Sequence, residues 1–192
     1  MVEVEIKLKI DSCEAIEAKL VELGFNKSHT LQETDYYYNG VDRDFRSSSE
    51  ALRLRLVEAL DGGALVADRP GEPLVQLTYK GPKLDSVSMS RVEHQVNVEE
   101  FETMHTILCS LGYKPVMPVI KLRREYFSEE MAACVDTVDG LGDFLELEIM
   151  VDNEEDREGA LGTIEKVLGS LGYSLSDTTT TSYLSMLEKL YP

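Results

Sequence analysis

The sequence contains four short segments in which aliphatic and charged residues alternate strictly, and this pattern restricts the fold more than any other feature. The segments are Val2–Lys9, Leu52–Leu56, Ile120–Arg123 and Leu145–Ile149. Successive side chains of a β-strand point to opposite faces, so each segment has one aliphatic and one charged face. A single strand of this kind is most simply part of a half-buried sheet with a solvated charged face. Because the arrangement occurs four times and the charges differ in sign, we predict that the aliphatic faces pack beneath helices and the charged faces line a common interior.

Period-two alternation elsewhere in the chain raises the number of predicted strands to eight, which is enough to close a barrel. The predicted strands cover residues 2–10, 34–39, 51–58, 74–80, 90–98, 118–127, 132–138 and 143–151. Three segments, 2–25, 91–113 and 145–173, each run from a strand into an apolar-periodic helix that ends at Leu-Gly-Phe or Leu-Gly-Tyr. A last helix is predicted from about Thr178 to Leu190, and the Gly- and Pro-rich segment 61–73 is predicted to be a hairpin loop over an opening. The expected fold is α+β, an eight-stranded antiparallel β-barrel with helices packed on the outside.

Length and charge limit what this fold can do. The 192 residues are most simply one domain, 1–192, which buries about two-thirds of its unfolded surface and needs no disulfide. The 36 acidic and 19 basic residues give a net charge of −17, which argues against nucleic acid and anionic membranes as partners. No stretch resembles a membrane span or a secretory signal, so a cytoplasmic location is expected. Cys13, Cys109 and Cys134 are widely spaced and are predicted to be free thiols.

If the charged faces point inward, nine ionisable side chains share one lumen. They are Glu3, Glu5, Lys7, Arg53, Arg55, Lys121, Arg123, Glu146 and Glu148. Burying charges without partners costs several kcal/mol per ion, so the carboxylates need cations and the basic groups need anions. A metal-bound triphosphate supplies both, because Mg²⁺ or Mn²⁺ prefers carboxylate and phosphate oxygens while Arg and Lys bind the remaining phosphate oxygens.

Motifs for other chemistries are missing from the sequence. It has no GxxxxGK[ST] loop, no GxGxxG turn after a strand and no GxSxG elbow. His29, His94 and His105 lack the spacing of zinc ligands, and His94 is given no role. The run Tyr36-Tyr37-Tyr38 is more simply explained by packing on a strand than by stacking on a base, although one ring can still reach a ligand.

Five short motifs occur in order along the chain. They are Glu3-x-Glu5-x-Lys7, Ala51-Leu52-Arg53-Leu54-Arg55, Thr78-Tyr79-Lys80-Gly81, Arg91-x-Glu93 and Glu146-x-Glu148. Together they resemble the CYTH domain of the triphosphate tunnel metalloenzyme superfamily, from residue 3 to the carboxyl end. Two longer strings, from Tyr38 to Arg53 and from Tyr79 to Asp85, are similar to the class IV adenylyl cyclase branch. Two positions depart from the family pattern: Met89 stands where members often carry Lys, and Gly40-Val41 stands where a proline often occurs.

The resemblance implies a charged tunnel that binds a nucleoside or other triphosphate with Mg²⁺ or Mn²⁺. The implied metal ligands are Glu3, Glu5, Asp136, Glu146 and Glu148, and the implied phosphate ligands are Lys7, Arg53, Arg55, Lys80, Lys121 and Arg123. Glu5 and Lys7 are the implied catalytic residues. Glu93 is expected to orient a basic neighbour, while Arg91 is either structural or a phosphate ligand. For Asp136 a simple turn or edge carboxylate is an equal alternative, since Asp favours turns.

The resemblance favours conversion of ATP to cyclic AMP and pyrophosphate. The first alternative is a triphosphatase that hydrolyses inorganic tripolyphosphate, thiamine triphosphate or a nucleoside triphosphate. The second is a noncatalytic module that binds triphosphate or polyphosphate. A third is an interaction scaffold, which requires the basic residues of the alternating strands to face solvent. A homodimer agrees with the resemblance and with the frequency of dimers among small enzymes.

Overall fold

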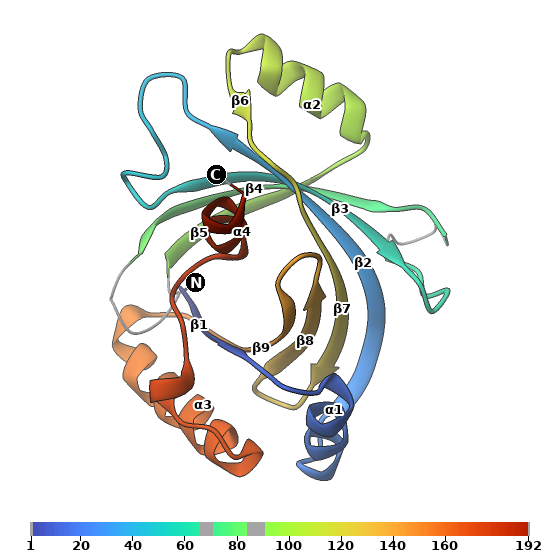
Figure 1. Cartoon of the computed structure of the whole chain (residues 1–192), viewed down its shortest axis with the longest axis vertical. Helices are drawn as coiled ribbons and strands as arrows, with labels where there is room; N and C mark the ends of the chain where they lie inside the picture. The colour runs from blue at the N-terminus through green and yellow to red at the C-terminus, as the bar shows by residue number, and fades with distance from the viewer. Residues whose placement is uncertain (1, 66–70, 84–90, 192) are drawn as a thin grey trace.

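Eight antiparallel strands close into a barrel in the computed structural model, which describes residues 2–65, 71–83 and 91–191 (Figure 1). The strands are β1 (Val2–Lys9), β2 (Asn26–Asn39), β3 (Ala51–Ala59), β4 (Leu74–Lys83), β5 (Arg91–Val98), β7 (Val119–Phe127), β8 (Ala132–Val138) and β9 (Gly142–Val151). Their order around the barrel is β3-β4-β5-β1-β9-β8-β7-β2, and the pairing of β2 with β3 closes the circle. The two-residue strand β6 (Lys114–Pro115) pairs with the end of β2. The predicted barrel is confirmed.

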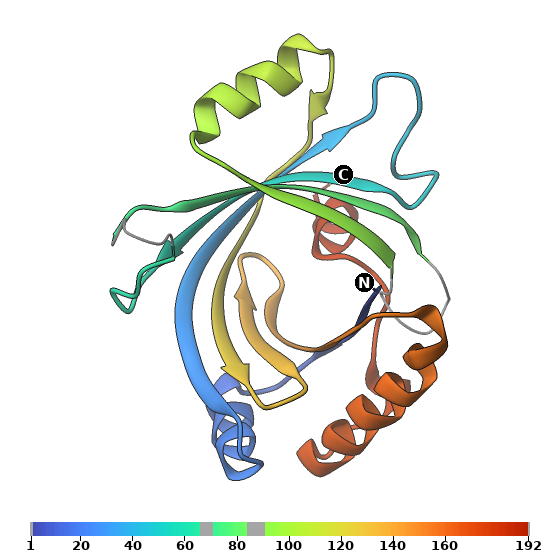
Figure 2. The ribbon, with the colours of Figure 1, turned by 180° about the vertical axis from the view of Figure 1, so that it is seen from behind.

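The aliphatic faces of the alternating strands point outward and lie beneath helices, as the charge pattern predicts. On β1, Val4, Ile6 and Leu8 are each at most 1% exposed. They belong to a hydrophobic cluster that includes residues of α1 (Cys13–Glu22) and α3 (Arg157–Leu171), which lie on the outside of the barrel (Figures 1 and 2). Burial of these side chains is the main stabilising contribution, worth about 1.5–3 kcal/mol for each large aliphatic residue. Because the outer face takes the apolar residues, the inner face is left to the charged ones.

A second hydrophobic cluster lies between the barrel and α2 (Phe101–Ser110). Leu52 and Leu54 of β3 are buried in it, and the Tyr36 ring packs at a tilt against Phe101 of the helix, with 4.7 Å between the ring centroids. Figure 2 shows α2 lying over the outside of the sheet, on the opposite end of the molecule from α1 and α3. The helices therefore cover separate parts of the outer surface and leave the lumen clear.

The last helix, α4 (Tyr183–Leu190), begins later than the predicted residue 178. The preceding segment pairs with β1 instead: Leu8 and Thr178 form an isolated bridge, and the Thr179 amide donates to the Lys7 carbonyl at 2.7 Å. The side-chain hydroxyl of Ser182 then accepts a hydrogen bond from the Ser185 amide and starts the helix. This pairing brings α4 against one opening of the barrel.

Strands β2 and β4 are longer than the sequence predicts, and β4 ends at Lys83 and not at residue 80. β2 begins at Asn26 and not at residue 34, and its pairing with β7 shifts register between Lys27 and Thr30. In the predicted loop 61–73, residues 66–70 lie outside the described part of the chain, as does residue 90 of the predicted strand 90–98.

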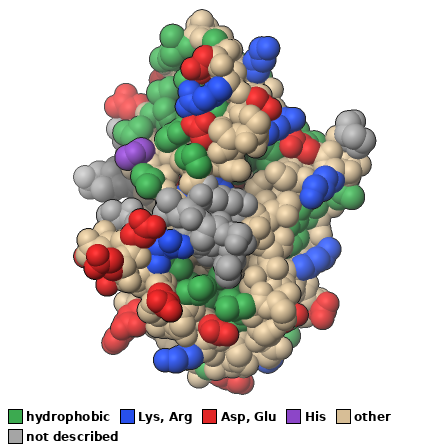
Figure 3. Space-filling view, turned by 90° about the vertical axis from the view of Figure 1, so that its left-hand side faces the viewer, with side chains coloured by type: hydrophobic (Ala, Val, Ile, Leu, Met, Phe, Trp, Pro, Cys, Tyr) green, Lys and Arg blue, Asp and Glu red, His purple; other side chains and the backbone are tan. Residues whose placement is uncertain are grey.

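The remaining surface features are simple. All three cysteines are free, with Cys13 and Cys134 buried and Cys109 exposed. Acidic and basic side chains are interspersed on the face seen in Figure 3. Within residues 2–65, 71–83 and 91–191, no helix has the length and apolar character needed to cross a membrane.

Candidate active site

The barrel encloses a cavity of about 1250 Å³ that is lined by strands β1 to β5, β7 and β9 and by α4. The sequence-predicted site residues that line it are Glu3, Glu5, Lys7, Arg53, Arg55, Lys80, Arg91, Glu93, Lys121, Arg123, Glu146 and Glu148. Asp136 is the one predicted site residue that does not line the cavity. The scaffold alternative places the basic residues on the outer surface and is wrong, because Arg53, Arg55 and Lys121 are at most 8% exposed.

Three carboxylates gather at the junction of β1 and β9. Glu5 and Glu148 are direct cross-strand partners, and Glu3 lies on the same face two residues from Glu5. Burial, together with repulsion from Glu5, raises the pKa of Glu148 to about 7. Burial raises the pKa of Glu3 to about 8, with Glu5 and Glu148 adding to the effect and Lys80 opposing it. Burial and mutual repulsion therefore oppose full ionisation of this cluster at neutral pH.

This carboxylate cluster fits a divalent cation. Its donors are all carboxylate oxygens, which Mg²⁺ and Mn²⁺ prefer, and a cation would remove the repulsion that raises the two pKa values. Among the described residues, no three His, Cys, Asp or Glu side chains converge closely enough to hold a metal ion unaided. Mg²⁺ commonly uses one or two carboxylates and completes its coordination with substrate phosphates and water. The donor set therefore suits a metal that binds together with a triphosphate.

Glu146 differs from these three carboxylates because its side chain is paired with two cations. The Lys7 ammonium is 3.1 Å from one Glu146 oxygen and 3.8 Å from Glu5, and the Arg123 guanidinium contacts the other Glu146 oxygen. Burial alone would raise the pKa of Glu146, but Lys7 and Arg123 hold it well below its ordinary value. Glu146 is therefore ionised and engaged with two cations.

Asp136 lies behind Arg123, away from the cavity. It is 0% exposed and accepts hydrogen bonds of 2.8 and 2.6 Å from the Arg123 guanidinium. A two-bond contact of this kind fixes the plane and direction of the guanidinium. These contacts support a positioning role for Asp136.

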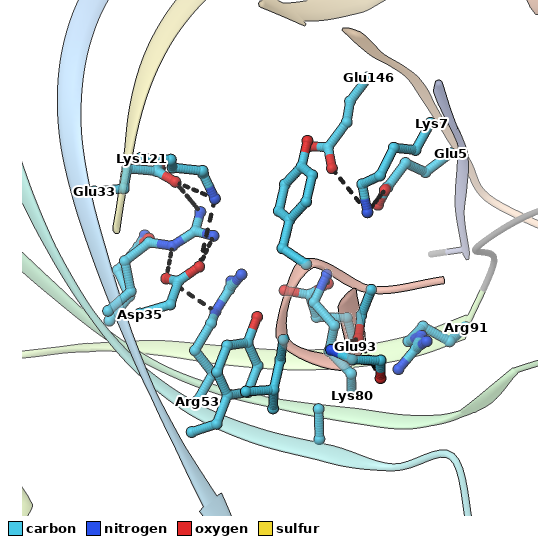
Figure 4. Close-up of a pocket in the computed structure, with 18 of the residues that line it drawn as sticks. Glu5, Lys7, Glu33, Asp35, Arg53, Lys80, Arg91, Glu93, Lys121 and Glu146 are labelled. Atoms are coloured by element: carbon cyan, nitrogen blue, oxygen red, sulfur yellow. Dashed lines mark hydrogen bonds and ion pairs between the residues drawn. The ribbon is translucent and has the colours of Figure 1, made fainter. Parts of the chain in front are cut away.

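Two lumen carboxylates on β2, Glu33 and Asp35, are missing from the sequence prediction. Arg55 donates to Asp35 at 2.5 and 2.9 Å and to Glu33 at 3.1 Å, and the Lys121 ammonium is 2.8 Å from Glu33 (Figure 4). Burial opposes ionisation, but Arg55 and Lys121 lower the pKa of Glu33 to about 2 and that of Asp35 well below its usual value. The neighbouring residues Gln32 and Thr34 on the other face are also polar, so no alternation of apolar and charged residues marks this part of β2.

Three further cations, Arg53, Lys80 and Arg91, lie on β3, β4 and β5. Lys80 lies 2.7 Å from Glu93 and 3.3 Å from Glu3. The Arg53 Nε atom is buried without a hydrogen-bond partner but lies 3.8 Å from an Asp35 oxygen, and the Arg53 Nη2 atom donates to Thr78 at 3.4 Å. The Arg91 Nη1 atom donates to the Ser49 carbonyl at 3.4 Å, and in the described part of the chain Arg91 makes no ion pair. Within the described residues, Arg91 therefore keeps donors free for an anion, while Arg53 is shared between Asp35 and Thr78.

Tyr183 of α4 is a further lumen residue that the sequence analysis did not single out. Its hydroxyl donates to Asp136 at 3.1 Å, and the Lys7 ammonium lies 4.2 Å from its ring centroid. Of the tyrosine run on β2, Tyr36 and Tyr38 belong to the hydrophobic cluster that includes α2, so packing accounts for these two rings, while Tyr37 lines the cavity and Tyr38 borders it as well.

Comparison with known proteins agrees with this geometry. The family model for the CYTH domain matches residues 1–183. The chain is 39% identical over 186 residues to a Methanocaldococcus jannaschii protein named "Putative adenylate cyclase", a match that covers 97% of this chain and 98% of the relative. It is 26% identical to the adenylate cyclase CyaB of Aeromonas hydrophila, over 97% of this chain and 89% of that protein.

A solved structure extends the similarity to three dimensions. The PH1819 protein of Pyrococcus horikoshii superposes with a TM-score of 0.86 at 33% identity, over 98% of this chain and 99% of that protein. The sequence match and the shared barrel agree over nearly the whole chain. This chain belongs to the CYTH domain family.

Proposed function

We propose that this protein is a divalent-metal-dependent adenylyl cyclase that converts ATP to cyclic AMP and pyrophosphate. The observation that carries the proposal is that a carboxylate cluster and a set of buried cations line the same lumen. Glu3 belongs to the cluster and Lys80 to the cations, and their side chains are 3.3 Å apart. A metal-bound triphosphate has the matching distribution of charge, with positive metal beside negative phosphate oxygens. The adenylate cyclase names of the two curated relatives support the nucleotide as substrate.

Different lumen residues would bind the metal and the phosphates. Glu3, Glu5 and Glu148 would hold Mg²⁺ or Mn²⁺, with Glu146 and Asp136 as further candidates from the family resemblance. The bound metal would neutralise phosphate charge and increase the acidity of the ribose hydroxyl. Arg53, Lys80 and Arg91 would bind phosphate oxygens through donors that their protein partners leave free.

The chemical step needs a proton acceptor and a stabiliser of the leaving group. The 3′-oxygen attacks the α-phosphorus, and the bond from that phosphorus to the bridging oxygen breaks. Glu5 would take the hydroxyl proton, while Lys7 and Arg123 would stabilise the charge that develops on pyrophosphate. The Lys7 ammonium is placed for this role by Glu146 on one side and the Tyr183 ring on the other.

The size of the cavity supports a nucleotide over a bare phosphate chain. About 1250 Å³ is more than the 300–1,000 Å³ of a usual small-molecule pocket, so a nucleoside has room beside the phosphates. Tyr37, Phe45 and Leu184 line the same cavity and offer apolar surface to a base or ribose. A cytoplasmic location and a homodimer stay predictions from the sequence.

A triphosphatase is the second candidate, because water can replace the ribose hydroxyl in the same site. A Hippeastrum protein with the same fold, at a TM-score of 0.59 and 19% identity, is described as having a dominant triphosphatase activity. The fold alone therefore does not select the cyclase reaction. A noncatalytic triphosphate-binding module has the same lumen but predicts binding without product.

Separation of products tests the proposal directly. The protein is incubated with Mn²⁺ or Mg²⁺ and either ATP or inorganic tripolyphosphate, and cyclic AMP, pyrophosphate and orthophosphate are resolved. We expect equal amounts of cyclic AMP and pyrophosphate from ATP, and loss of both in Glu5→Gln. Orthophosphate without cyclic AMP would replace the proposal with the triphosphatase. Metal-dependent binding without any product would favour the noncatalytic module.

A further inference from the structure

A row of four side chains crosses the inner face of strands β2 to β5. They are direct cross-strand partners in the order Tyr37, Arg53, Thr78 and Gln95. Tyr37, Arg53 and Gln95 line the cavity, but Thr78 is 0% exposed and does not line it. Because a ligand in the lumen cannot touch Thr78, any effect of its hydroxyl on that ligand must pass through a neighbouring side chain.

The Thr78 hydroxyl is oriented by Gln95. It donates to the Gln95 Oε1 atom at 2.9 Å, which uses its single proton and leaves its lone pairs to accept. The Arg53 Nη2 atom donates to the same hydroxyl oxygen at 3.4 Å. Thr78 therefore presents an acceptor, and not a proton, to the guanidinium.

The other contact of Arg53 attracts the guanidinium without fixing its direction. Figure 4 shows Arg53 beside Asp35, with its guanidinium pointing into the lumen. The Arg53 Nε atom is 3.8 Å from an Asp35 oxygen, which is beyond hydrogen-bond distance. The two Asp35 oxygens already accept hydrogen bonds of 2.5 and 2.9 Å from Arg55. In the described part of the chain, the bond to Thr78 is therefore the one hydrogen bond that orients Arg53.

We propose that Thr78, oriented by Gln95, is a positioning residue that holds the Arg53 guanidinium in the direction in which it binds a substrate phosphate. This inference rests on the proposed function, since it takes Arg53 as a phosphate ligand of the lumen. Thr78 belongs to neither the carboxylate cluster nor the basic residues, so its role is additional to theirs.

A hydroxyl restrains an arginine without adding a negative charge that competes with the phosphate. A carboxylate in its place would form a stronger, charge-assisted bond, and a phosphate would then have to displace it or share the guanidinium with it. A side chain that is already held also loses less conformational freedom when a ligand binds, which increases affinity without a new contact. Thr78 should therefore improve phosphate binding although it contacts no phosphate.

Thr78→Val removes the hydroxyl and keeps the shape of the side chain. The probe is the bis(methylene) analogue of inorganic tripolyphosphate with Mg²⁺, which has no P–O–P bond to cleave. Without its acceptor the Arg53 guanidinium is free to rotate, so the dissociation constant measured by calorimetry should rise about tenfold, which corresponds to ~1.4 kcal/mol. Thr78→Ser keeps the hydroxyl and should stay within about threefold of the wild type.

The kinetics of ATP turnover with Mn²⁺ separate positioning from a loss of folded protein. Thr78→Val should raise KM about tenfold and change kcat by less than about threefold, because the ground state and the transition state lose the same contact. A merely structural defect would lower kcat at constant KM, and that result would overturn the inference.

Thr137→Val is the matched control. The Thr137 hydroxyl accepts a hydrogen bond of 3.2 Å from Arg124, the same kind of contact, but neither of these residues lines the cavity. This variant should leave the dissociation constant within about twofold of the wild-type value. Gln95→Met tests the other end of the row: without the Gln95 acceptor the Thr78 proton is no longer directed away from Arg53, and binding should weaken by about threefold or more.

The effect of Thr78→Val should disappear when Arg53 is replaced as well. Arg53→Met alone should weaken binding more than about tenfold, and the double variant should bind within about twofold of Arg53→Met. Equal weakening by Thr78→Val in both backgrounds overturns the inference, because the hydroxyl would then act independently of Arg53.

Failure of this inference and failure of the proposed function give different results. A wild-type protein that binds neither ATP nor the methylene analogue overturns the proposed function. If the wild type binds and Thr78→Val binds equally well, only the positioning role is overturned. Thermal unfolding identifies any variant that does not fold. Should Thr78→Val be unfolded, Gln95→Met decides, and unchanged binding in that variant overturns the inference.

Discussion

The hydroxyl of Tyr183 donates a hydrogen bond of 3.1 Å to Asp136, and this contact joins the last helix of the chain to the interior of the barrel. Asp136 in turn holds Arg123, whose guanidinium lines the cavity. The Tyr183 ring also lies beneath the Lys7 ammonium. One aromatic side chain from α4 therefore contacts two parts of the site that come from β1 and β8.

Two substitutions of Tyr183 should separate the contribution of its hydroxyl from the contribution of its ring. Tyr183→Phe removes a hydrogen bond to a charged, fully buried acceptor, so the free energy of unfolding should fall by about 1–3 kcal/mol. The ring remains beneath Lys7, so the variant should keep metal-dependent turnover. Tyr183→Leu also removes the contact with Lys7 and should lose turnover by more than about tenfold. Urea unfolding and initial rates measure the two effects.

Tyr191→Phe is the matched control for these two variants. Tyr191 follows α4 and is 60% exposed, so loss of its hydroxyl should change stability by less than about 0.5 kcal/mol. If Tyr183→Phe is as stable as Tyr191→Phe, the link from α4 to Asp136 does not contribute to stability.

The stability of the metal-free protein should decrease as the pH rises from about 5 to about 8. In the folded state Glu3 and Glu148 have pKa values raised to about 8 and about 7, above the ordinary 4.5 of an unfolded chain. The folded protein therefore binds more protons than the unfolded one in this range, and that contribution is lost as the two groups ionise. Glu33 acts in the opposite sense, because its pKa is lowered to about 2 and its contribution is lost only in acid.

Urea unfolding with a chelator present, repeated across this pH range, measures the effect. Saturating Mg²⁺ or Mn²⁺ should remove most of the decrease, because the metal replaces the protons at the same carboxylates. A metal-free stability that increases between about pH 5 and pH 8 would contradict the repulsion inferred at Glu3 and Glu148.

Much of the barrel could be predicted because its strands separate apolar from charged residues completely. On β1 and β9 every outward residue is aliphatic or aromatic at the centre of the strand, so the inward face follows from alternation alone. β2 was predicted too short because Gln32 and Thr34 on its outer face are polar, like Glu33 and Asp35 on its inner face. With no apolar alternation over this part, the sequence holds no period-two signal there.

The sequence could not predict which side chains contact each other across the lumen, and the reason here is different. Tyr183 has the spacing of an ordinary apolar helix residue and is 6% exposed, as such a residue would be. Its contact with Asp136 spans 47 positions and depends on the pairing of Thr178 with β1. The pattern of a helix predicts that one face is buried but does not specify what that face contacts. The pairing of Glu93 with Lys80, in contrast, agrees with the prediction that Glu93 orients a basic neighbour.

Asp136→Asn should distinguish a metal ligand from a positioning residue. Asp136 lies outside the cavity lining and engages Arg123 and Tyr183, so the substitution should lower kcat by misplacing Arg123 while the metal concentration for half-maximal activity changes by less than about threefold. Titration of activity with Mn²⁺ at saturating ATP provides both quantities. A large rise in the required metal concentration would instead support the metal role that the family resemblance implies for Asp136.

Glu148→Gln should make the metal-free protein more stable and the enzyme less active. Glu148 is buried beside Glu5 and its charge is opposed by burial and by that neighbour, so a neutral amide of the same shape removes an unfavourable interaction. The decrease in stability between about pH 5 and pH 8 should therefore become smaller in this variant. The same change removes a carboxylate oxygen from the proposed cation site, so Mn²⁺ should bind more weakly, by about tenfold, in calorimetric titration. Glu125→Gln, outside the cluster, should leave the affinity for Mn²⁺ unchanged. A Glu148→Gln protein that is less stable than the wild type in chelator, and that binds Mn²⁺ as tightly, would show that Glu148 serves the packing of the barrel and not the metal.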